Sequence, residues 1–253
     1  MTLILSIETA TDVCSIALSD EETIIDSISI NEKNVHSARL ALMIRQMMTK
    51  NRKSFGELNA IAVSKGPGSF TGLRIGISIG KGLAYGLDIP IIGINTLESI
   101  AYRASQLDNH AGIIWCPVID ARNNEVYYAL YDQEINEIHA AEAGLINDSS
   151  FAAFESQGKI RYAGPAVDSL TIPKLLSSKA DFLFHIRPDA ENIAKLAYKK
   201  YKVLKFEDIT FFEPFYLRDF KVKFPSTRIN KVLSMKQDTL SKDPSLKSQI
   251  PNS

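Results

Sequence analysis

The sequence predicts an α/β protein made of two copies of one folding unit, and two observations support this prediction. Strand-length apolar runs and helical patterns follow one another in the order β-β-β-α-β-α-β-α over residues 3–105. The opening of that unit then recurs 112 residues later, where residues 118–131 again read as strand, acidic residue, turn and strand. A repeat that begins directly after a complete unit indicates an internal duplication.

Three strands open the first unit. Residues 3–8 form a compact apolar run that is typical of a buried strand, and residues 13–19 and 23–30 are two further strand candidates. Short turns separate the three runs, so we expect an antiparallel meander.

A helix is predicted from residue 37 onward, because the apolar period changes there. Leu40, Met43, Ile44, Met47 and Met48 follow the spacing i, i+3, i+4, i+7, i+8, which places them on one helical face. Two interpretations stay open for this stripe. It packs into the core, or it faces a partner, for which methionine gives an adaptable contact surface.

A glycine-rich loop, K-G-P-G-S-F-T-G-L-R at residues 65–74, joins the strand 60–64 to the next helix. Such a loop can direct backbone N–H groups and a helix N-terminus at an anion, which makes Gly66 and Gly68 weak candidates for cofactor binding. The spacing matches neither G-x-x-x-x-G-K-[ST] nor G-x-G-x-x-G, since Thr71 stands at the last glycine position of the second motif. The alternative is a tight turn without a ligand.

Within the helix that follows, Gly72, Gly76 and Gly80 recur every four residues, and Ala84 continues the row. Each glycine destabilises a helix by about 1 kcal/mol relative to alanine, so three on one face need a compensating reason. Close approach of another backbone supplies that reason. The sequence leaves open whether the neighbour is internal or belongs to a partner chain.

The acidic residues Glu8 and Asp120 end matched strands of the two units. In a two-lobed nucleotide-binding enzyme such a pair would flank the cleft and hold Mg²⁺ through water. The alternative is that both carboxylates cap turns.

The second unit has weaker patterns, and its helices are predicted at residues 168–177 and 189–203. We predict an N-terminal lobe at residues 1–105 and a C-terminal lobe at residues 106–225. Residues 226–253 lack glycine, aromatic residues and a clear period, which predicts a flexible, mildly basic tail.

The composition favours a cytoplasmic globular protein. Among 253 residues, 29 are basic and 29 acidic, so the whole chain lacks the strongly basic footprint of a nucleic-acid-binding protein. We expect Cys14 and Cys116 to be buried and reduced, and no Cys/His spacing predicts a metal site. The N-terminus lacks a basic start, and the apolar run 75–87 is too short to span a bilayer.

Six segments carry a resemblance to a known family. They read I-E-T-A-T-D-V-C-S-I-A-L (7–18), H-S-A-R-L (36–40), A-V-S-K-G-P-G-S-F-T-G-L-R-I-G-I-S-I-G-K-G-L-A (62–84), I-N-T-L-E-S-I-A (94–101), I-D-A-R-N-N-E-V-Y (119–127) and P-F-Y-L-R (214–218). In this order they resemble the bacterial TsaB (YeaZ) family over about residues 1–218, and G-P-G-S-F-T-G-L-R-I-G is a highly specific block.

The resemblance implies an actin-like (ASKHA) fold with two RNase H-like lobes, each with a mixed sheet. It also implies a role in forming N6-threonylcarbamoyladenosine in tRNAs that read codons starting with adenosine. A separate enzyme makes threonylcarbamoyl-adenylate, and the catalytic paralogue TsaD transfers the threonylcarbamoyl group. The implied partners are a TsaD-like paralogue, a TsaE-like ATPase and a second copy of the chain; tRNA is contacted only indirectly, and no membrane is involved.

One departure from the catalytic paralogue implies a non-catalytic chain with no metal and no cofactor of its own. Catalytic members carry N-H-L-E-G-H, whose two histidines bind a metal, whereas Thr96 and Ile100 stand at those positions here. The predicted partner interface therefore lies on the two helices described above, at Leu40, Met43, Met47, Gly72, Gly76 and Gly80. The alternative is an active ATPase, kinase or metallopeptidase of the same superfamily.

Overall fold

In the computed structural model, the described residues are 1–32, 36–108, 110–154, 156–169, 171–172, 176 and 180–217. Residues 1–217 form one compact unit. The predicted tail 226–253 therefore lies outside the described residues. None of the described helices is long and apolar enough to cross a membrane.

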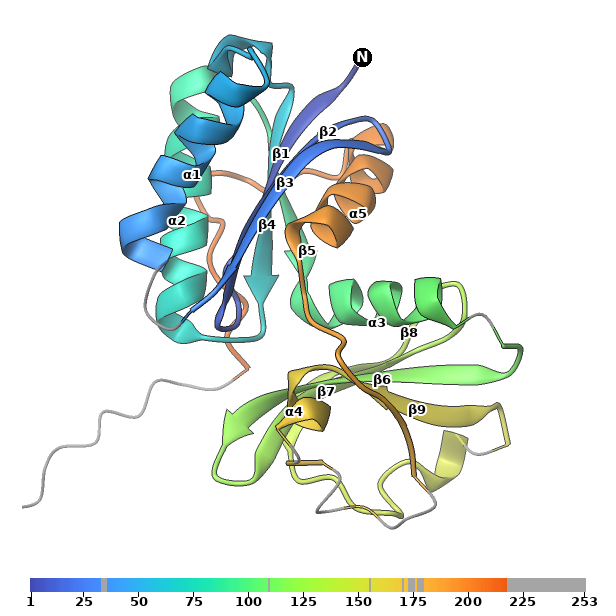
Figure 1. The fold of residues 1–253 in the computed structure, drawn as a ribbon. Helices are drawn as coiled ribbons and strands as arrows, with labels where there is room; N and C mark the ends of the chain where they lie inside the picture. The colour runs from blue at the N-terminus through green and yellow to red at the C-terminus, as the bar shows by residue number, and fades with distance from the viewer. Residues whose placement is uncertain are drawn as a thin grey trace, which may run out of the picture. The chain divides into compact units, whose positions relative to one another are not determined.

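The first half of the chain builds a five-stranded sheet in the order β3-β2-β1-β4-β5 (Figure 1). Its strands are β1 (Leu3–Glu8), β2 (Val13–Asp20), β3 (Thr23–Asn31), β4 (Ala60–Gly66) and β5 (Ile91–Asn95). The first three pair antiparallel, as predicted, and β4 and β5 continue the sheet in parallel with β1.

The second half builds a sheet of the same topology, in the order β10-β9-β6-β7-β8. Its strands are β6 (Ile113–Arg122), β7 (Glu125–Tyr131), β8 (Glu137–Gly144), β9 (Lys159–Ala163) and β10 (Asp181–Leu183). Here β6 takes the central place of β1, with an antiparallel hairpin partner on one side and a parallel strand on the other. The matched sheets confirm the duplicated fold with mixed sheets.

Helices cover both faces of the first sheet (Figure 1). On one face, α1 (His36–Lys50) and α2 (Phe70–Leu87) pack over a core that includes Leu5, Ile16 and Val63. On the other face, α5 (Ala190–Lys202) packs over Ile4 and Ile92. Burial of a side chain of this size stabilises the fold by roughly 1.5–3 kcal/mol.

The helices α3 (Thr96–Leu107) and α5 each pack mainly on the sheet of the other half. Leu97, Ala101 and Ala104 of α3 join a cluster with Trp115 of β6, whereas Ile193 of α5 lies against the first sheet. The predicted lobe boundary between residues 105 and 106 stays a prediction. Each sheet is covered in part by a helix from the other half of the chain.

The structure shows a second repeat signal that pattern reading did not use. Gly66 ends β4 and precedes Pro67, and Gly164 follows β9 and precedes Pro165. Both glycines have positive φ, at 114° and 123°. A side chain at either position would be strained, and its Cβ would also meet a carbonyl oxygen, that of Phe215 or of Val118. The matched pair lies in the corresponding strand-to-helix connection of the two units.

The second unit differs from the prediction in its helices. The predicted helix 168–177 is wrong, because α4 spans only Pro165–Asp168 and residues 171–172 and 176 lie outside it. Gly164 and Pro165 begin this helix about three residues earlier than the sequence pattern indicates. The helix predicted at 189–203 is confirmed as α5, with Asp189 as its N-cap.

The glycine row of α2 packs inside the protein. A Cβ on Gly72 would collide with the carbonyl oxygen of Thr9, and one on Gly76 would collide with its hydroxyl. A Cβ on Gly80 would come within 2.6 Å of Val63 Cγ1. Of the two neighbours left open by the sequence, the structure therefore shows the internal one, which is the end of β1 and the adjacent β4.

A matched pair of glycine substitutions tests this packing. Gly72→Ala should lower the free energy of unfolding by about 2 kcal/mol, because the new methyl group meets the fixed backbone of Thr9. Gly82→Ala should raise it by about 0.5–1 kcal/mol, because nothing lies within 4 Å of its Cβ position and alanine favours the helix. Urea denaturation measures both. Equal shifts in the same direction would contradict the internal close approach.

Candidate functional site

The glycine-rich loop is filled by the chain's own backbone. The Ser69 N–H donates to the Ala10 carbonyl oxygen at 2.6 Å, and the Gly72 N–H donates to the Ser69 hydroxyl at 3.2 Å. A Cβ on Gly68 would collide with Ala10. The Ser69 N–H therefore holds the turn after β1, the Gly72 N–H is used to cap α2, and Ala10 occupies the space beside Gly68.

Beside this loop, Glu8 is a completely buried carboxylic acid at the end of β1. Its Oε1 accepts a hydrogen bond from the Ala10 N–H at 2.5 Å, whereas no partner of Oε2 is found among the described residues. Burial raises the pKa of Glu8 to about 7, although the Ala10 N–H and the Ser64 hydroxyl partly oppose that rise. The group is thus poised between its neutral and charged forms near neutral pH.

The N-terminus of α5 closes over Glu8. The Ala190 N–H donates to the Ser15 hydroxyl at 3.0 Å, and Ser15 pairs with Glu8 across β1 and β2. Asp189 caps α5 by accepting from the Asn192 N–H at 2.8 Å, and its charge also raises the pKa of Glu8. Burial likewise raises the pKa of Asp189 above its usual value.

Asp120 takes the matched position at the end of β6, but its surroundings differ. Its side chain is exposed, and Oδ1 accepts from the Arg122 N–H at 2.6 Å, as a turn-capping carboxylate does. Glu8 has no exposed surface. A magnesium ion held through water by both residues would therefore require Glu8 to move into solvent.

Thr96 and Ile100 lie in the interior, at the first and second turns of α3. Both side chains are fully buried, and Ile100 belongs to an apolar cluster that includes Trp115 and Ile186. Isoleucine has no donor atom for a metal ion. Among the described residues, no group of three or more His, Cys, Asp or Glu side chains is arranged to hold a metal.

The six residues predicted to contact a partner do not form a surface in this structure. Their side chains or Cα positions face the core of the first lobe, and all six are buried: Leu40, Met43, Met47, Gly72, Gly76 and Gly80. The physical reason is that the methionine stripe and the glycine row both lie against the sheet. Any partner surface of α1 and α2 must therefore be formed by their outer faces.

The outer face of α2 carries a second row of small residues, Ser78, Gly82 and Gly86, which pattern reading missed. All three are exposed, and nothing lies within 4 Å of the Cβ positions of the two glycines. The internal packing of α2 gives no reason for these helix-destabilising glycines. Their i, i+4 spacing is visible in the sequence, but the buried row beside it hides the signal.

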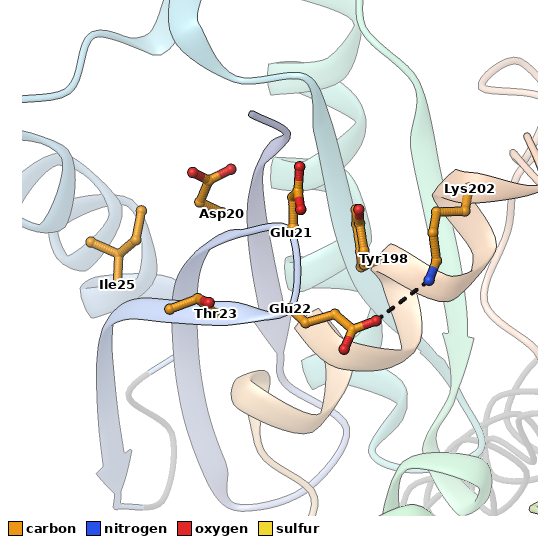
Figure 2. Close-up of a pocket in the computed structure, with 7 residues that line it drawn as sticks. All are labelled: Asp20, Glu21, Glu22, Thr23, Ile25, Tyr198 and Lys202. Carbon is orange, nitrogen blue, oxygen red and sulfur yellow. Dashed lines mark hydrogen bonds and ion pairs between the residues drawn. The ribbon is translucent and has the colours of Figure 1, made fainter.

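A separate hollow of about 550 Å³ lies at the other end of the first sheet (Figure 2). Figure 2 shows an ion pair between Lys202 of α5 and Glu22 in the turn between β2 and β3. The Lys202 Nζ–Glu22 Oε1 distance is 3.4 Å. Leu3 pairs with Asp20 at this end of β1, whereas Glu8 is at the opposite end. The hollow is therefore separate from the glycine loop. It is lined by Asp20, Glu21, Glu22, Thr23, Ile25, Tyr198 and Lys202.

The family model and two of the curated relatives that match this chain concern threonylcarbamoyladenosine in tRNA. The family model described as "TsaD: tRNA N6-adenosine threonylcarbamoyltransferase" matches residues 23–185. The chain is 39% identical over 139 residues to the tRNA threonylcarbamoyladenosine biosynthesis protein TsaB of Escherichia coli (strain K12), covering 55% of this chain and 59% of that protein. It is 38% identical over 128 residues to the protein of the same name from Bacillus subtilis (strain 168), covering 51% and 54%.

A solved structure extends the similarity over more of the chain. The structure described as YeaZ from Pseudomonas aeruginosa superposes with a TM-score of 0.74 at 25% identity, and it covers 86% of this chain and 100% of that one. The sequence alignments are shorter, so the chain spans about half to three fifths of the length of the curated relatives that it matches.

The buried Glu8 predicts a pH dependence of stability. Its pKa is about 7 in the folded chain against 4.5 for a free side chain, so between these values the folded state binds more protons than the unfolded state. Stability should therefore fall as pH rises from about 4.5 to 7, by about 3 kcal/mol from this group. In Glu8→Gln that contribution should vanish, as measured by urea denaturation from pH 4.5 to 8. If both proteins show the same pH slope, Glu8 does not titrate as inferred.

Proposed function

This chain belongs to the TsaD family, in its TsaB (YeaZ) branch, and we propose that it is a non-catalytic scaffold subunit in the formation of N6-threonylcarbamoyladenosine in tRNA. A TsaD-like paralogue would carry out the transfer, on tRNAs that read codons starting with adenosine. The curated relatives bear the name of this biosynthesis, which supports the assignment to the pathway. The proposal that the paralogue is catalytic and this chain is not depends on the residues at positions 96 and 100.

The interior position of Ile100 is the main observation in support of a non-catalytic role. A metal site at this place needs two donor side chains one helical turn apart, and it needs room for a substrate beside them. Ile100 instead packs against Trp115 in the core, and the Thr96 hydroxyl is fully buried. Packing thus replaces the donor atoms that the catalytic paralogue has at these positions.

The outer faces of α1 and α2 support a partner-binding role. Ser78, Gly82 and Gly86 would let a partner helix approach the backbone of α2 closely. Leu42 on α1 and Tyr85 on α2 are 41% and 81% exposed, and they would supply apolar contact area beside that row. We propose that the matching helices of the paralogue dock here, and that a second copy of this chain uses the same surface when the paralogue is absent.

The charge of the described body supports indirect contact with tRNA. Residues 1–217 hold 21 of the 29 basic residues and 26 of the 29 acidic ones, so their formal charge is −5. Phosphate backbones bind to surfaces rich in lysine and arginine. In the proposed complex the paralogue therefore supplies the main tRNA surface. The TsaE-like ATPase remains a further expected partner from the resemblance alone.

One leucine substitution tests the docking surface. Gly82→Leu should weaken binding to the TsaD-like paralogue at least tenfold while the chain stays folded, because a large side chain enters the open space over α2. Gly56→Leu is the matched control, since its Cβ position is equally open and it lies outside both helices. Titration calorimetry and size-exclusion chromatography measure the binding. Unchanged affinity in Gly82→Leu would contradict docking on this face.

Reconstitution tests the division of roles. With tRNA and threonylcarbamoyl-adenylate, the paralogue should modify tRNA only when this chain is added, and this chain alone should give no product. The enzymatic alternative predicts a different result for the isolated chain. Tight Mg-ATP binding with hydrolysis that is lost in Asp120→Asn would favour that alternative and would contradict the scaffold role.

A further inference from the structure

The segment after α5, residues 207–216, runs along α2 and is called the C-terminal strap here (Figure 1). It begins where the Glu207 N–H donates to the Ile91 carbonyl oxygen at 2.9 Å. Lys81 of α2 donates to the Phe212 carbonyl oxygen at 3.0 Å, and the Phe215 N–H donates to the Lys65 carbonyl oxygen at 2.7 Å. The strap is thus attached both to the helix and to the strand before it.

The outer face of α2 lies between α1 and the strap. Ile75 and Ile79 pack on the core cluster that includes α1 side chains, whereas Lys81 reaches the strap. Residues two apart on a helix, such as Ile79 and Lys81, project about 160° from each other. Near the start of α2, Arg74 donates to the Tyr216 hydroxyl at 3.0 Å. A partner that binds over Gly82 would therefore also lie beside the strap.

The strap forms a cavity of about 350 Å³ with Lys65. Three phenylalanines and three carboxylates line it, against one ammonium group, and that group is paired with Glu207 at 3.2 Å. Phe211 is 80% exposed, and Glu213 is also exposed. The full lining is Lys65, Glu207, Asp208, Phe211, Phe212, Glu213, Pro214 and Phe215.

We propose that this cavity receives a lysine or arginine side chain of the paralogue that docks on the outer face of α2. An exposed aromatic ring beside a carboxylate attracts a cation through the ring face and through charge. An anion would be repelled by the excess of carboxylates, and a purely apolar side chain would leave Glu213 to be desolvated without a partner. The inference rests on the proposed scaffold function and adds a second contact to it.

Two strap variants test the proposal by titration calorimetry with the TsaD-like paralogue. Phe211→Ser and Glu213→Lys should each weaken binding about tenfold, because each removes one of the two groups that would hold the cation. Their matched controls are Phe184→Ser and Glu134→Lys, which make the same changes on exposed residues of the second lobe. Affinity for the unaltered chain should fall as NaCl rises, and it should fall less for Glu213→Lys. One lysine-to-glutamate or arginine-to-glutamate change in the paralogue should restore binding to Glu213→Lys.

The outcomes separate this inference from the proposed function. No binding of the paralogue to the unaltered chain would overturn both. Binding that is lost in Gly82→Leu but unchanged in both strap variants would overturn the strap contact alone. A loss in Phe211→Ser without any effect of Glu213→Lys or of salt would show an apolar contact and would overturn the basic side chain as its occupant.

Discussion

The close approach of α2 to the end of β1 is the contact on which the rest of the first lobe depends. Gly72 and Gly76 let the helix backbone rest directly on Thr9, and the Ser69 N–H holds the Ala10 carbonyl oxygen at 2.6 Å. Any side chain on this row would push the helix away from the sheet. The contact fixes α2 in place, and it uses the glycine loop and part of its N–H groups for structure instead of for a ligand.

Two further positions where this fold could support chemistry are also filled by packing. Ile100 joins the apolar core under α3, and Glu8 is sealed beneath the N-terminus of α5. Both helices cover the sheet of the other half, so their docking links the two halves of the body. The proposed scaffold role uses the outer face of α2 and the strap, which lie outside these packed positions.

The strength of the local signal decided how well each part could be predicted. Residues 3–105 alternate clear strand and helix periods, and the structure confirms all eight elements in order. In the second half the pattern predicts a helix over residues 168–177, whereas the helix described there, α4, spans only Pro165–Asp168. The Gly-Pro pairs at residues 66–67 and 164–165 could have marked that connection, since glycine followed by proline is typical of a turn and proline favours the first position of a helix.

The sequence by itself determined the duplication and the first lobe, because periodicity is a local property. It also shows Thr96 and Ile100 at the positions where the resemblance implies that the catalytic paralogue has histidines. Only the tertiary structure decided which side of α2 faces the core. Two glycine rows lie on one helix, and their spacing is the same, so the sequence cannot rank them. The backbone and side chain of Thr9 leave room only for glycine at Gly72 and Gly76, so this row faces the interior and Gly82 and Gly86 face outward.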